Sequence, residues 1–157
     1  MIKVQSSILI DCPVDDAFQY VSAGFFENYP KWSPEVVELE KITNGPVRMG
    51  TMARQVRIDK GRRTESIFQV TEHQPPWQIE FGSLSSPRYQ ARYNLEPVAA
   101  EKTHIRFTFE LRLEFFMRPF ENVIASAVKA GSQNVVCNLK QLLEAEKPTQ
   151  SMTALVF

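Results

Sequence analysis

The feature that most constrains this chain is a change of hydrophobic period close to Pro119. Before it, apolar and polar residues alternate in a series of short segments, of which residues 104–113 are the clearest. In that segment Ile105, Phe107 and Phe109 share one face, while polar and charged residues occupy the other. Alternation of this kind predicts antiparallel strands with one buried and one solvated face.

After this point the period becomes helical. From about Arg118 to Glu146, apolar residues recur at spacings of three and four, which predicts one amphipathic helix. Pro148 is expected to end it. A helix this long requires an equally long apolar surface opposite it, and the strands supply that surface.

The first 35 residues add a strand and two short helices. Residues 6–11 read as the strand, and Pro13 followed by Asp15 and Asp16 is typical of a helix start. Residues 25–32 form a second short helix or turn. The sequence therefore predicts an α+β domain in which a curved antiparallel sheet of about seven strands wraps around a long C-terminal helix.

Composition excludes several classes of protein. Eighteen basic residues balance eighteen acidic ones without forming a basic stripe, which argues against nucleic-acid binding. No apolar run approaches the roughly 20 residues of a membrane-spanning helix, so we expect a cytoplasmic protein without integral membrane association. Residues 1–147 are expected to form a single domain.

The cysteines and histidines do not predict a metal site or a cofactor. Cys12 and Cys137 lack metal-ligand spacing, although the sequence leaves open one disulfide bridge between them. His73 and His104 have no partner at ligand spacing. We therefore expect no metal and no cofactor.

The last ten residues, 148–157, are treated as a C-terminal tail. Its end carries three apolar residues, Leu155, Val156 and Phe157. We expect them to pack on the domain or on a neighbouring chain, which leaves a homodimer open.

The order of elements resembles the START-like superfamily, also called the birch-pollen-allergen-like or SRPBCC fold, and within it the polyketide cyclase/dehydrase branch. Four stretches within about residues 3–146 carry this resemblance: Glu27 to Val37, Ile8 to Pro13, Gly45 to Thr51, and Asn138 to Lys140. The resemblance implies the helix-grip fold, with a ligand cavity between the sheet and the helix. It does not imply one activity, because this fold supports carriers, receptors, cyclases and co-chaperones.

Alternation then indicates which residues would line such a cavity. Small-molecule sites are mostly apolar with a few placed polar groups. The predicted ligand-binding residues are Trp32, Met52, Arg54, Phe68, Phe81, Tyr89, Tyr93, Phe109, Phe120, Ile124 and Val128. Arg54 is expected to point inward because it shares a face with Met52, unless it lies at the open rim of the site. Arg54, Tyr89 and Tyr93 are the candidates for a catalytic role, although the two tyrosines could simply fill the core.

Three functions remain open at this stage. The first is a carrier or sensor that binds a small hydrophobic molecule such as a lipid, polyketide or isoprenoid. The second is a cyclase/dehydrase-like enzyme that uses the same cavity for aldol cyclisation and dehydration, because orientation can supply much of such catalysis. The third, and weakest, is a protein-interaction role with the pocket collapsed.

Overall fold

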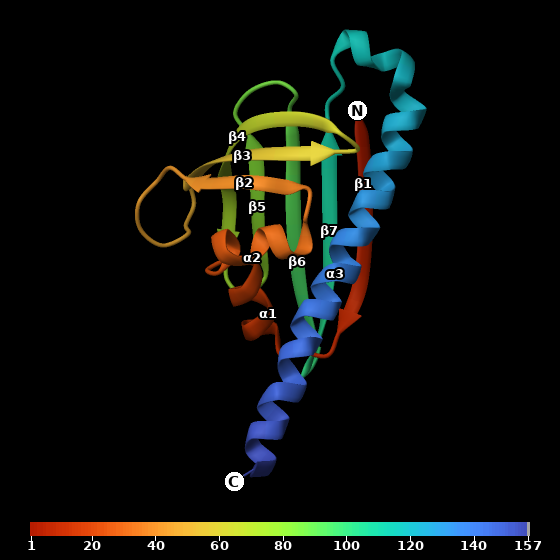
Figure 1. Ribbon diagram of the computed structural model, residues 1–157. Helices are drawn as coiled ribbons and strands as arrows, with labels where there is room; N and C mark the ends of the chain where they lie inside the picture. The colour runs from red at the N-terminus through yellow and green to blue at the C-terminus, as the bar shows by residue number, and fades with distance from the viewer. Residues whose placement is uncertain (157) are drawn as a thin grey trace.

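A single seven-stranded antiparallel sheet curves around the C-terminal helix (Figure 1). The computed structural model describes the backbone of residues 1–156 and the side chains of residues 1–145. Strand order across the sheet is β1-β7-β6-β5-β4-β3-β2. The strands are β1 (Ile2–Ile10), β2 (Val36–Lys41), β3 (Met52–Asp59), β4 (Arg62–Gln74), β5 (Gln78–Ser83), β6 (Tyr89–Ala99) and β7 (Lys102–Leu111).

The helices occupy the positions that the sequence predicts. Two short helices, α1 (Val14–Val21) and α2 (Phe25–Trp32), follow the first strand. A 3-10 helix, η1 (Phe115–Phe120), leads from the last strand into the long helix α3 (Glu121–Val156). The predicted α+β helix-grip fold is therefore confirmed, with its order of elements.

The hairpin between β3 and β4 illustrates how local sequence sets the register of the sheet. Lys60 and Gly61 both have positive φ angles, 51° and 83°. A two-residue turn with positive φ at both positions matches the twist of the flanking strands, and glycine adopts that conformation without strain. The turn consequently pairs Asp59 with Arg62.

The long helix differs from its prediction at the C-terminal end. Its backbone continues through Pro148 to Val156, so the expected stop at that proline is wrong. A proline inside a helix removes one backbone hydrogen bond and can bend the helix without ending it. The predicted packing of Leu155, Val156 and Phe157 lies outside the described residues.

The two halves of α3 differ in how closely they pack against the rest of the domain. In the second half, the Asn138 side chain donates to the Trp32 carbonyl at 3.0 Å, and Lys140 donates to the Leu9 carbonyl at 3.0 Å. Leu139 and Leu143 are buried there against the core. The first half, up to residue 131, has no buried residue. The second half of α3 therefore closes one end of the domain tightly, and the first half covers the other end only loosely.

None of the helices in the described part of the chain combines the length and the apolar character required to cross a bilayer.

Candidate functional site

The concave face of the sheet is lined by aromatic side chains. Phe68, Phe81 and Tyr93 are buried, and their rings form a series of edge-to-face contacts with centroids 5.7 and 6.2 Å apart. Tyr89 and Phe109 lie on the same face towards the loosely covered end, where they are only half-buried and stack at 5.9 Å. The structure thus brings together five of the residues predicted for the site.

Trp32 lies in the closed half of the domain. Its side chain is 1% exposed, and its Nε1 donates to the Tyr93 hydroxyl at 3.2 Å. Phe25 packs edge-on against it, with ring centroids 5.9 Å apart. Burial among these partners makes Trp32 a core residue in this structure.

The predicted inward orientation of Arg54 is wrong. Its guanidinium pairs with Glu65 at 2.6 Å and lies 3.9 Å from both Glu38 and Glu40. Glu38 and Glu40 project from the outer face of β2, since Leu39 between them packs on the core. Glu65 projects from the outer face of β4. Met52 shares the outer face with Arg54 by alternation, because Ala53 between them is buried in the core. Neither residue is therefore placed to contact a ligand on the concave face.

Val56 also lies on the outer face by alternation, and it is nevertheless fully buried. Its register partners are Glu38 and Glu65, and both carboxylates are bridged by Arg54.

The polar residues that do face the concave side of β3 are Gln55 and Arg57. Gln55 is 4% exposed and accepts a hydrogen bond from the Tyr29 hydroxyl at 3.0 Å. Arg57 donates to that hydroxyl at 3.2 Å and to Ser33 at 3.1 Å. Sequence reasoning missed both, because alternation alone does not tell which of two faces is the inner one. The burial of Ala53 on the same face, which identifies it as the inner one, is visible only in the structure.

The Gln55 amide extends this network towards the loosely covered end. Its Nε2 donates to the Tyr89 hydroxyl at 2.9 Å and to Ser66 at 3.3 Å. The Tyr89 and Ser66 hydroxyls are themselves 2.9 Å apart. The concave face therefore has an apolar aromatic surface that is crossed by one continuous network of hydrogen-bonded polar side chains.

The predicted helix residues lie on the loosely covered half of α3 and on η1. Ile124 and Val128 are half-buried, and they continue the stripe that becomes fully buried at Val136 and Leu139. Phe120, in η1, is 61% exposed. The stripe is thus only half-buried in the first half of α3 and becomes fully buried in the second half.

The phenols of the concave face are all weak acids in this setting. Burial raises the pKa of Tyr89 to about 12, and burial also raises the pKa values of Tyr29 and Tyr93. For Arg57, burial by itself lowers the pKa, but the neighbouring Tyr29 and Asp59 outweigh it and the net pKa is raised. These tyrosines therefore remain protonated at neutral pH and act as hydrogen-bond donors there.

The raised pKa values predict a loss of stability at alkaline pH. An unfolded tyrosine ionises near pH 10, so above that pH the folded state retains protons that the unfolded state has lost. The free energy of unfolding should be insensitive to these phenols below about pH 9 and should fall above pH 10, by roughly 1.4 kcal/mol per pH unit for each buried phenol. Urea titrations between pH 8 and 11 measure this slope.

The matched variant for this measurement is Tyr93→Phe. It removes one titrating phenol, so the slope above pH 10 should be shallower than in the wild-type protein. An unchanged slope would contradict the assignment to Tyr93.

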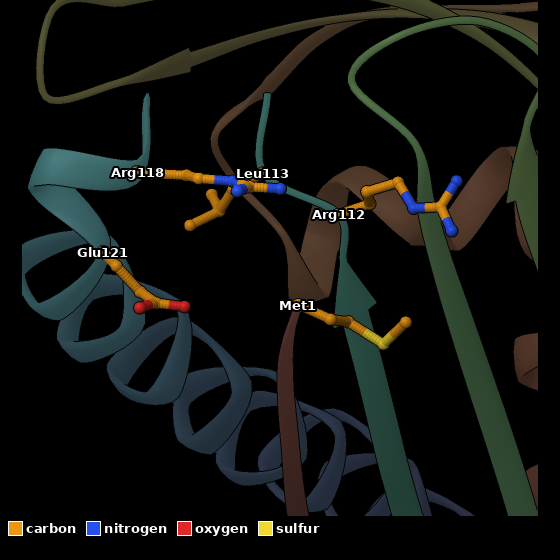
Figure 2. Close-up of a pocket in the computed structure, with 5 residues that line it drawn as sticks. All are labelled: Met1, Arg112, Leu113, Arg118 and Glu121. Carbon is orange, nitrogen blue, oxygen red and sulfur yellow. The ribbon is translucent and has the colours of Figure 1, made fainter. Parts of the chain in front are cut away.

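Two surface pockets lie at the end of the sheet where α3 begins. Figure 2 shows the first, of about 690 Å³, between the start of β1, the end of β7 and the start of α3. It is lined by Met1, Arg112, Leu113, Arg118 and Glu121. The second, of about 430 Å³, shares Met1 and Arg112 and includes Tyr89. Of the residues predicted from sequence, only Tyr89 lines either pocket.

The remaining candidate groups have structural environments. His73 is 3.0 Å from the Ser22 hydroxyl, and its ring lies 5.9 Å from that of Phe18. Cys12 is buried and Cys137 is exposed, and they are not joined to each other, so the disulfide bridge that the sequence left open does not form. Within residues 1–145, no three His, Cys, Asp or Glu side chains are grouped so as to hold a metal ion.

Comparison with known families and structures gives a consistent result. Residues 1–144 match the family described as polyketide cyclase/dehydrase and lipid transport. No curated protein matches the chain.

Three solved structures illustrate the similarity of fold. The Zhui aromatase/cyclase from Streptomyces sp. R1128 aligns with a TM-score of 0.75 at 16% identity, over 90% of this chain and 93% of that one. A START superfamily protein from Mycobacterium smegmatis aligns with a TM-score of 0.72 at 16% identity, over 91% and 97%. The di-domain aromatase/cyclase BexL, from the BE-7585A biosynthetic pathway, aligns with a TM-score of 0.72 at 21% identity, over 92% of this chain and 47% of that one. At these identities the structural similarity concerns the fold.

Proposed function

Because the chain belongs to the polyketide cyclase/dehydrase and lipid transport family, we propose that it binds a small hydrophobic molecule between the concave face of the sheet and the first half of α3. In this proposal the protein acts as a carrier or sensor. The ligand is a lipid, a polyketide or an isoprenoid-like molecule.

One observation carries this proposal: apolar side chains on facing surfaces remain partly exposed at one end of the domain. Tyr89 and Phe109 on the sheet, and Ile124 and Val128 on α3, are all half-buried. The same face and the same stripe are fully buried at the other end, at Phe81 and Leu139 among others. Covering this surface with an apolar ligand would gain roughly 25 cal/mol for each Å² removed from water.

The proposed binding residues are side chains of the concave face, of α3 and of η1. They are Phe68, Phe81, Tyr89, Tyr93, Phe109, Ile124 and Val128, with Phe120 at the exposed edge and Trp32 supporting Tyr93 from the core. Gln55, Tyr29 and Ser66 supply the polar part of the site.

Native mass spectrometry of freshly purified protein tests the proposal. We expect a bound small molecule, or, after its removal, saturable binding of the apolar fluorophore 1,6-diphenylhexatriene. Protein that carries no ligand and also fails to bind the fluorophore would contradict the carrier or sensor function.

Substitution at Val128 tests the location. Val128→Trp places a bulky side chain on the inward stripe of α3 at a half-buried position, so it should weaken fluorophore binding by at least about tenfold through loss of space. Val123→Trp is the matched control, because Val123 is 71% exposed. Fluorescence titration of both variants measures the difference, and equal affinities would place the ligand elsewhere.

An enzyme of the cyclase/dehydrase type is the second candidate, and the Arg57–Tyr29–Gln55 network is the observation that favours it. A positively charged group linked by hydrogen bonds to phenols could stabilise a developing enolate. The high pKa of Tyr89 opposes a role as proton donor at neutral pH, because a general acid works best with a pKa near the working pH. Incubation with a linear poly-ketone, followed by mass spectrometry for loss of water, distinguishes the enzyme from the carrier.

A further inference from the structure

The hydrogen-bonded network on the concave face runs from donor to acceptor in one direction. This direction determines which polar group is left to contact a ligand. The network begins at Arg57, whose guanidinium has only donors and whose Nη1 lies 3.2 Å from the Tyr29 hydroxyl oxygen. That oxygen accepts from Arg57, so its own proton points elsewhere. The Gln55 Oε1, at 3.0 Å, is the acceptor placed to receive it.

The orientation of the Gln55 amide follows from this first step. If the amide were reversed, its NH2 group would face the Tyr29 hydroxyl, and the Tyr29 proton would have to go to Ser33, whose hydroxyl also hydrogen-bonds this phenol and already accepts from Arg57. In the structure the Gln55 carbonyl oxygen is the acceptor instead, at 3.0 Å. Oε1 therefore faces Tyr29, and Nε2 faces the two hydroxyls of Tyr89 and Ser66.

This far end has four donor protons, two on Nε2 and one on each hydroxyl, but only three hydrogen bonds. Nε2 donates to both hydroxyl oxygens, and the two hydroxyls are 2.9 Å apart, so one of them donates to the other. The second hydroxyl retains a proton for which the described side chains offer no further acceptor within hydrogen-bonding distance. Whichever hydroxyl donates inside the pair, one O–H is left to point at the site.

We propose that the Tyr89–Ser66 pair is the polar subsite of the concave ligand site, and that it selects an apolar ligand carrying an uncharged carbonyl oxygen, such as a ketone or an ester. This inference rests on the proposed function, because it assigns the chemistry of the same site.

The surroundings of the pair agree with this assignment. Tyr89 and Ser66 are half-buried, at the end of the network that lies towards the loosely covered half of the domain. The Phe109 ring stacks on Tyr89 and offers an apolar surface for the body of the ligand beside the donor. Because burial raises the pKa of Tyr89 to about 12, its phenol is protonated across the physiological range.

The experiment compares two compounds of the same shape. 2-Acetylnaphthalene carries a carbonyl, and 2-isopropenylnaphthalene replaces its oxygen with a CH2 group. Calorimetry gives the ratio of the two affinities, and any difference in their hydration cancels when this ratio is compared between variants. We expect the ratio to fall roughly fivefold in the double variant Tyr89→Phe/Ser66→Ala, as loss of one neutral hydrogen bond predicts.

The single variants make the test specific. Tyr89→Phe leaves the Ser66 proton free, and Ser66→Ala leaves the Tyr89 proton free, so each should change the ratio by less than about twofold. A structural effect of the double variant would weaken both compounds equally, and the ratio would not change. An unchanged ratio in the double variant, or a full loss in one single variant, overturns the inference.

A spectroscopic measurement on the wild-type protein needs no variant. A donated hydrogen bond lowers the stretching frequency of a ketone, so the infrared carbonyl band of bound 2-acetylnaphthalene should lie below its position in hexane. A band at the hexane position overturns the inference. If 2-isopropenylnaphthalene nevertheless binds tightly, the proposed function still stands. If the protein binds neither compound, both fail.

Discussion

Replacing Trp32 with alanine is expected to lower the free energy of unfolding by about 4 kcal/mol. The indole is 1% exposed and packs among the rings of Tyr20, Phe25, Tyr29 and Tyr93. Its removal leaves a large cavity and deprives the Tyr93 hydroxyl of its donor. Chemical denaturation followed by circular dichroism measures the change.

The chain contains its own control for this experiment in Trp77, the second of its two tryptophans. Trp77 is 50% exposed in the turn between β4 and β5, so Trp77→Ala should change the free energy of unfolding by less than about 1 kcal/mol. If Trp32→Ala were no more damaging than Trp77→Ala, the placement of Trp32 in the core would be wrong.

The second large effect is expected at Arg57. Arg57→Met removes the donor from Tyr29 and Ser33 and the ion pair with Asp59 at 3.2 Å. We expect the free energy of unfolding to fall by about 2 kcal/mol, because polar groups packed inside the domain lose their partner. Binding of a ketone probe should weaken as well, since Tyr29 no longer holds the Gln55 amide in one orientation.

Arg54→Met provides the matched comparison, because the two arginines are three residues apart on the same strand. Arg54 lies on the outer face, and its ion pairs with Glu38, Glu40 and Glu65 are exposed to solvent. Such pairs typically contribute 0–1 kcal/mol, and the probe affinity should not change. A larger loss of binding in Arg54→Met than in Arg57→Met would show that the faces of β3 are assigned the wrong way round.

Much of the fold follows from local sequence patterns. Alternation of apolar residues predicts most of the strands, and the apolar stripe between about Arg118 and Glu146 predicts the long helix. These signals are local because the periods of strand and helix arise from backbone geometry alone. The helix end was mispredicted because the cost of one internal proline is small beside the rest of a 36-residue helix.

The candidate site was predicted less completely, and the reason lies in the assignment of faces. Along β7 the apolar and charged faces are unambiguous, and Phe109 was placed correctly on the concave side. Along β3 both faces carry an arginine and an apolar residue, so the pattern identified which residues share a face without identifying the inner one. The choice of Arg54 over Arg57 followed from that ambiguity.

The sequence by itself determined the class of fold, the order of its elements and the aromatic character of the concave face, because each depends on patterns within one segment. Only the tertiary structure decided which arginine lies inside, since that depends on the carboxylates that neighbouring strands bring to each face. It also joined Arg57, Tyr29, Gln55, Ser66 and Tyr89 into one network. These residues come from four different elements, and no local period relates them.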